Sequence, residues 1–97
     1  TVSTVAPKGA IAAIANFGKT VQLAISLHAS TDELRQELVP GIHDRTIEQL
    51  LDEAEDYFNI TGREFTIEYV LLSGVNDSLE QAQQLADLLR NSRCHVN

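Results

Sequence analysis

The strand that decides the fold reads Val21-Gln22-Leu23-Ala24-Ile25-Ser26-Leu27-His28. Every odd position is aliphatic, whereas the even positions are Gln22, Ala24, Ser26 and His28. Because successive side chains of a strand point to opposite faces, one face of this strand is apolar and the other is largely polar. A parallel strand covered by helices on both faces is normally apolar on both. We therefore expect helices to cover only one face of this strand.

The other strands and the helices are predicted from the same kind of periodicity. Residues 64–72 form a second two-faced strand, with Thr66 and Glu68 opposite Phe65 and Ile67. The full predicted order is strand 1–5, helix 10–17, strand 21–28, helix to 38, helix 46–58, strand 64–72, helix 78–91, and a strand from 94. Strands separated by helices imply parallel pairing with right-handed crossovers. The sequence thus predicts an α/β fold.

The helix ends carry capping signals. Ser30 with Glu33, and Thr46 with Gln49, have the spacing of a capping box. Gly18 and Gly62 are predicted helix stops, and the chain is expected to break at Pro40. The last helix is expected to pack through its regularly spaced apolar positions, Leu79, Ala82, Leu85, Ala86 and Leu89. The acidic positions of helix 46–58 are predicted to form a solvated face, namely Glu48, Asp52, Glu53, Glu55 and Asp56.

The composition excludes several classes of function for these residues. The 97 residues include 14 acidic and 7 basic side chains, for a net charge of −7, so this chain alone is not expected to bind nucleic acid. Its single cysteine, Cys94, excludes an internal disulfide and a complete iron–sulfur site. No signal peptide and no membrane-spanning run is present, which predicts a cytoplasmic protein with no membrane partner.

The polar strand faces give the first functional hint. They require water, a ligand or the interior of a barrel as their neighbour, and a (β/α) barrel places its site at the carboxyl ends of its strands. His28 and Asn76 follow such ends, and Ser26 precedes His28 on the same predicted face. The alternative is an edge or antiparallel strand with one wet face. No metal site is predicted, because Cys94 and His95 are adjacent on a strand and point to opposite faces.

Five short strings, in this order and spacing, resemble one family. They are residues 2–5 (VSTV), 23–29 (LAISLHA), 32–35 (DELR), 67–78 (IEYVLL, then GVNDS) and 94–97 (CHVN). The chain resembles the middle of the radical S-adenosylmethionine (SAM) methyltransferases that modify an adenine of RNA, namely the RlmN type and its Cfr-type relative. The resemblance covers essentially all 97 residues.

The resemblance implies that residues 1–97 are the central part of a radical SAM domain, a partial (β/α)6 barrel truncated at both ends. The full-length enzyme would methylate adenine C2 in 23S rRNA and in tRNA, using SAM and a [4Fe–4S] cluster. The cluster ligands and both mechanistic cysteines would lie outside this chain, so the isolated segment is expected to be inactive. Unpaired strand edges of such a segment would also allow two copies to dimerise.

The resemblance further implies which residues bind SAM. Matched by position, these are Ser3, Ser26, Leu27 and His28, with Leu27 acting through its backbone. No catalytic residue is implied, and no role is carried over for Glu68 or Asn76. The sequence departs from the family where Val5-Ala6-Pro7 replaces the usual glycine after STV. A divergent paralogue, a radical SAM enzyme with another substrate, and an acidic α/β module that binds a small ligand or a protein remain alternatives.

Overall fold

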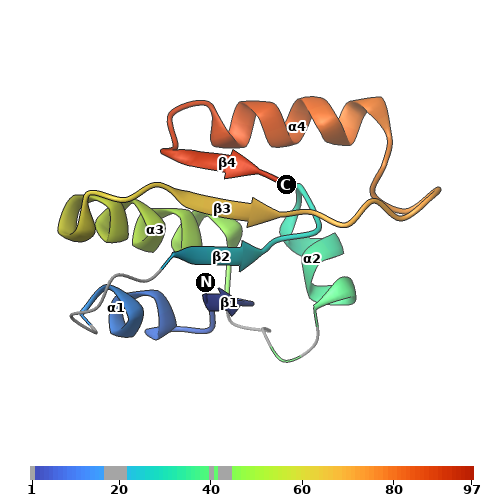
Figure 1. Ribbon diagram of the computed structural model, residues 1–97. Helices are drawn as coiled ribbons and strands as arrows, with labels where there is room; N and C mark the ends of the chain where they lie inside the picture. Colours follow the sequence, from blue (N-terminus) through green and yellow to red (C-terminus); the bar gives the residue numbers. More distant parts are fainter. Residues whose placement is uncertain (1, 17–21, 40, 42–44) are drawn as a thin grey trace.

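The fold is α/β, as predicted, with four parallel strands joined by helices (Figure 1). The computed structural model describes residues 2–16, 22–39, 41 and 45–97. Its elements are β1 (Val2–Thr4), α1 (Ala10–Ala15), β2 (Leu23–Ser26), α2 (Asp32–Leu38), α3 (Ile47–Thr61), β3 (Phe65–Glu68), α4 (Leu79–Leu89) and β4 (Cys94–Val96). The strands lie in the order β1-β2-β3-β4, so each pairs with its neighbour along the chain.

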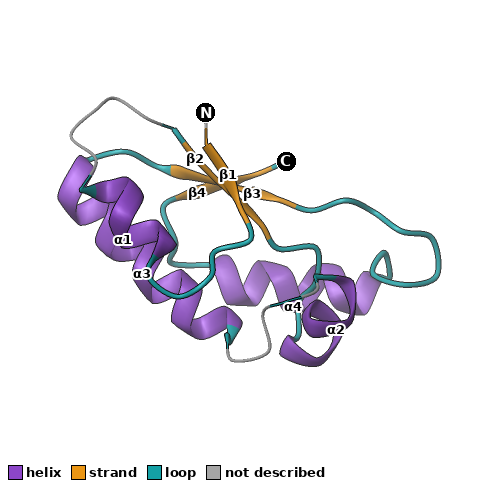
Figure 2. Ribbon diagram, turned by 90° about the horizontal axis from the view of Figure 1, so that it is seen from below, coloured by secondary structure: helices purple, strands orange, loops and turns teal. Residues whose placement is uncertain are grey.

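The helices lie on one side of the sheet, and no described segment covers the other side (Figure 2). Leu23, Ile25 and Leu27 are buried against the helices, together with Phe65 and Ile67 of β3. Their alternation partners Ser26, Thr66 and Glu68 are only half-buried. The two-faced pattern of β2 and β3 therefore corresponds to a helix-covered face and an open face, which we call the open sheet face.

The strands are shorter than the sequence predicts. β3 ends at Glu68 instead of Leu72, and β2 ends at Ser26 instead of His28. From the second residue beyond the end of β3, side chains supply hydrogen bonds to the backbone: the Val70 N–H donates to Nδ1 of His28, and the Leu72 N–H donates to Oδ1 of Asn76. The predicted helix end at Phe17 and Gly18, the strand start at Val21 and the break at Pro40 lie outside the described residues.

The capping prediction for α2 was wrong by one residue. Thr31, not Ser30, is the N-cap, and its hydroxyl accepts a hydrogen bond from the Leu34 N–H at 3.4 Å. The Ser30 hydroxyl instead donates to the side chain of Gln84 on α4 at 2.7 Å. Ser30 thus tethers α2 to α4, and Thr31 takes over the capping role.

The longest helix, α3, begins as predicted and ends later. Its capping box between Thr46 and Gln49 is confirmed, and Gly62 ends it in a left-handed conformation with φ of 71°. The helix continues past Phe58 to Thr61. In the described parts of the chain, no helix is both long and apolar enough to cross a membrane.

The predicted packing of α4 is only partly correct. Leu89 is buried, and Leu85 and Leu88 pack against the core. In contrast, Leu79 is 88% exposed, and Ala82 and Ala86 are exposed as well. For Leu79 the reason is position, because the start of α4 extends past the carboxyl end of β4 and no strand of the sheet lies beneath it (Figure 1).

The difference in burial between the leucines of α3 and α4 predicts that leucine-to-alanine substitutions in the two helices change the free energy of unfolding by different amounts. Leu50→Ala on α3 removes a side chain with 0% exposure and should lower the free energy of unfolding by about 2–5 kcal/mol. Leu79→Ala should change it by less than about 0.5 kcal/mol, because the Leu79 side chain is solvated. Urea unfolding measures both values. A comparable loss for Leu79→Ala would contradict the exposed position of the first turn of α4.

Candidate functional site

Two of the predicted SAM-binding residues lie on the open sheet face. Ser3 of β1 pairs with Ala24 of β2, so both belong to the same face of the sheet. Ser26 lies on that face two residues further along β2, and it pairs with Glu68 of β3. The sheet therefore brings the Ser3 and Ser26 hydroxyls and the Glu68 carboxylate to one surface near the carboxyl ends of three neighbouring strands.

His28 lies just past the end of β2 in a conformation that is unusual for a non-glycine residue. Its φ is 60°, in the left-handed region. Its Nδ1 accepts a hydrogen bond from the Val70 N–H at 3.0 Å. Because Nδ1 is an acceptor, the neutral imidazole carries its proton on Nε2, and Nε2 is available as a donor.

Leu27 separates Ser26 from His28 and faces the opposite way. Its side chain is fully buried in the core between the sheet and the helices. Its backbone N–H donates to the Glu68 carbonyl at 3.0 Å. Any ligand contact of Leu27 would therefore be made through its carbonyl oxygen.

Asn76 joins the ends of β2 and β3. Its side-chain amide donates to the carbonyls of His28 and Val70, both at 2.8 Å, and its Oδ1 accepts from the Leu72 N–H at 2.7 Å. The Tyr69 hydroxyl donates to the Asn76 carbonyl, also at 2.8 Å. Asn76 is thus a buried link between the His28 turn and the segment that follows β3.

Arg35 of α2 links the ends of β1 and β2, as Asn76 links those of β2 and β3. The side chain is 1% exposed, and Nη2 donates to the carbonyls of Val5 at 2.8 Å and Ser26 at 2.9 Å. Among the described residues, Nε and Nη1 have no hydrogen-bond partner. Burial lowers the pKa of Arg35, the nearby Arg45 lowers it further, and Asp32 opposes both. Arg35 nevertheless stays charged at neutral pH, as arginine does in proteins.

Arg45 secures the turn after β1. Its Nε donates to the Ala6 carbonyl at 3.0 Å, and its guanidinium pairs with Glu53 of α3. Ala6 also has a left-handed φ, at 58°, at the place where the sequence departs from the family's glycine. Glu53 was predicted to lie on the solvated face of α3, and this was wrong because the Arg45 guanidinium draws it into an ion pair.

Sequence reasoning missed the roles of both arginines. The one available signal concerns Arg35, which borders the apolar stripe formed by Leu34 and Leu38 on α2. Arg45 precedes α3 and has no periodic pattern around it, so nothing marked it as buried.

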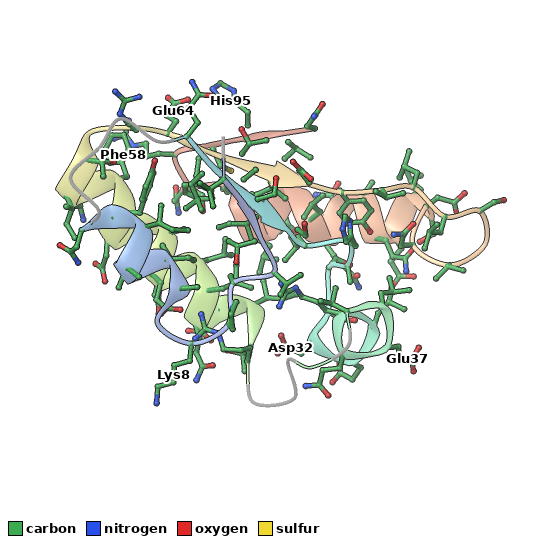
Figure 3. All side chains as sticks on the ribbon, turned by 60° about the horizontal axis from the view of Figure 1, so that its bottom comes forward. Lys8, Asp32, Glu37, Phe58, Glu64 and His95 are labelled. Carbon is green, nitrogen blue, oxygen red and sulfur yellow. The ribbon has the colours of Figure 1, made fainter. Side chains whose placement is uncertain are left out.

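His95, next to Cys94 on β4, lies beside a carboxylate. The imidazole Nε2 of His95 lies 2.6 Å from the Glu64 carboxylate, and the two side chains are directed toward each other in Figure 3. Cys94 is half-buried, and burial raises the pKa of its thiol. Within the described segments, no group of three or more His, Cys, Asp or Glu side chains could hold a metal ion.

Comparisons with known proteins define the class. A solved radical SAM methyltransferase from Sphaerobacter thermophilus matches 99% of this chain with a TM-score of 0.94 and 46% sequence identity. The match covers 28% of that protein. No family model matches the chain. By fold and by sequence, the chain matches an α/β segment of a radical SAM methyltransferase.

The sequence relatives identify the family within this class. A probable dual-specificity RNA methyltransferase RlmN from Rippkaea orientalis is 47% identical over all 97 residues. Ribosomal RNA large subunit methyltransferase N from Nitrosopumilus maritimus is 45% identical over the same length. Over its whole length the chain matches a segment of RlmN-type RNA methyltransferases, which confirms the resemblance, and it spans 28% of the length of these two relatives.

The His28 environment predicts how its ring titrates. Burial lowers the pKa of His28, Glu68 raises it, and Arg35 lowers it. An NMR titration should therefore find the His28 pKa below its ordinary value of 6.5. Glu68→Gln should lower this pKa further, because the opposing negative charge is removed. Glu37→Gln, an exposed change on α2, is the control and should leave it unchanged.

The same shift predicts a pH dependence of stability. A folded-state pKa below the unfolded-state value means that the unfolded chain takes up the proton first as the pH falls. The contribution of His28 to stability is then complete above about pH 6.5 and is lost as the pH falls toward the folded-state pKa. Protonation of Nδ1 would also remove the acceptor for the Val70 N–H. A His28 pKa above its ordinary value would contradict this account.

Proposed function

We propose that this chain forms part of the SAM pocket of a radical SAM methyltransferase that methylates adenine C2 in 23S rRNA and tRNA. The observation that carries the proposal is the open sheet face, where Ser3 and Ser26 lie on neighbouring strands and His28 follows the end of β2. The RlmN-type relatives and their names support the RNA substrate. Such an enzyme acts in the cytoplasm, where these RNAs are found.

The residues of the open sheet face fit SAM chemically. The Ser3 and Ser26 hydroxyls can donate to or accept from ribose hydroxyls and the methionine carboxylate, and Nε2–H of His28 and the Leu27 carbonyl add one donor and one acceptor. SAM, when bound, supplies the methyl group and the radical chemistry. The role of these residues is to fix its position, because radical chemistry is directed to one hydrogen by geometry.

The residues of this chain do not fit the [4Fe–4S] cluster. Such clusters are held by several cysteine thiolates, and the chain contains only Cys94. We therefore assign the cluster to residues outside this segment and derive no step through it. For the same reason the isolated segment, residues 1–97, is proposed to be the inactive centre of a larger radical SAM domain.

The RNA substrate is also proposed to bind mainly through other parts of the enzyme. A net charge of −7 opposes contact between this segment and phosphates. Among the described strands, β1 and β4 form the sheet edges, and dimerisation of two copies through such edges stays a prediction.

Serine substitutions test the SAM pocket. In the full-length protein, Ser26→Ala and Ser3→Ala should each weaken SAM binding by about 2- to 12-fold, the effect of one lost hydrogen bond. Ser92→Ala is the matched control, because Ser92 precedes β4 at the opposite ends of the strands. Equilibrium dialysis with labelled SAM measures the affinities.

The outcomes separate the parts of the proposal. Unchanged SAM binding by both Ser26→Ala and Ser3→Ala would contradict the pocket. If SAM binds as proposed but anaerobic assays with 23S rRNA and tRNA yield no C2-methylated adenine, the RNA substrate is wrong and a radical SAM enzyme with another substrate is indicated.

A further inference from the structure

Asn76 is the only uncharged polar residue that is buried in the described part of the chain. Its exposed fraction is 2%, and the other two buried polar residues are Arg35 and Arg45. It lies in the turn between β3 and α4, away from the helix-packed core, and neither SAM binding nor catalysis assigns it a role. Burying an amide is favourable only when its hydrogen bonds are made, so the partners of Asn76 show what it does.

All three hydrogen bonds of the Asn76 side chain go to backbone groups beyond the ends of β2 and β3. Both amide hydrogens are used, one on the His28 carbonyl and one on the Val70 carbonyl. Oδ1 receives the Leu72 N–H, and the Tyr69 hydroxyl holds the Asn76 backbone in place. Asn76 therefore fixes the spacing of two segments after their ladder hydrogen bonds have ended.

His28 depends on this link in two ways. Its left-handed backbone is unfavourable for a residue with a β-carbon, and it persists only where the surroundings hold it. The Asn76 amide holds the His28 carbonyl, and it also holds Val70, whose N–H donates to Nδ1 of the His28 ring. The same side chain thus stabilises both the turn and the tautomer of His28.

We propose that Asn76 is a positioning residue of the SAM site, which holds the His28 turn and ring in the arrangement that binds SAM. This inference rests on the proposed function, since it assumes that SAM contacts His28. Asn76 itself does not touch SAM in this account. Its effect on SAM binding passes through the His28 carbonyl and the Val70 backbone.

The test is Asn76→Asp in the full-length protein. Aspartate has nearly the same shape and keeps an acceptor for the Leu72 N–H, but it has no donors and places a negative charge against two carbonyl oxygens. The variant loses the two hydrogen bonds that Asn76 donates to the His28 and Val70 carbonyls, which hold the His28 turn in its binding arrangement. SAM affinity should therefore fall about tenfold or more. The 15N shifts of the His28 ring should show that Nδ1 has lost its donor. Asn59→Asp, the same change at an exposed site on α3, should match the wild-type protein in both measurements.

A second variant keeps the proposal testable if Asn76→Asp does not fold. Tyr69→Phe removes only the hydroxyl that holds the Asn76 carbonyl, and it should weaken SAM binding by a few-fold with a smaller change in the His28 shifts. If a folded Asn76→Asp, or failing that Tyr69→Phe, leaves both SAM affinity and the His28 shifts as in the wild type, the proposal is overturned. If the wild type binds no SAM, the proposed function fails, while the His28 shifts still test the positioning role.

Discussion

The carboxyl edge of the sheet depends on hydrogen bonds from three buried polar side chains to backbone carbonyls. Arg35 holds the carbonyls of Val5 and Ser26, Arg45 holds that of Ala6, and Asn76 holds that of His28. These are the only buried polar residues in the described part of the chain. A backbone carbonyl that lies past the paired part of a parallel strand and is shielded from water needs a hydrogen-bond donor, because leaving it buried and unpaired costs about 1–3 kcal/mol. The same donors hold two non-glycine residues, Ala6 and His28, in left-handed turns.

This arrangement explains how a largely polar face can be both open and ordered. The core on the helix side orders β2 and β3 from below, and the carbonyl donors order the segments beyond their ends. The side chains of Ser3 and Ser26 are then not needed to order the strands and are available to bind a ligand. Binding to a site that is already ordered costs little conformational entropy, and a fixed position of the reacting group is what radical chemistry requires. The helix-covered face of β2 and β3 thus contributes to stability, whereas the open sheet face of the same strands is the one proposed to bind SAM.

The sequence predicted the parts of the fold that follow from local patterns. The alternation in β2 predicted the two faces of the sheet, and the spacing of Thr46 and Gln49 predicted the start of α3. It did not predict contacts that depend on which distant groups meet in space, such as the Arg45–Glu53 pair or the tether from Ser30 to Gln84. Leu79 shows the converse: its helical periodicity is correct, but no strand lies beneath it. In the proposed site, Ser3 was predicted from the family resemblance and Ser26 from the resemblance and its strand face, whereas the side chains that donate to the carbonyls required the three-dimensional structure.

The central claim is that the open sheet face is a wall of the SAM pocket, and that the carbonyl donors order the segments at its carboxyl edge. The most direct measurement is a crystal structure of the full-length protein with SAM bound. The account predicts SAM against β1 and β2, with its polar atoms within hydrogen-bonding distance of the Ser3 and Ser26 hydroxyls and the His28 turn still left-handed. SAM bound elsewhere, or an open sheet face filled by protein side chains, would contradict it.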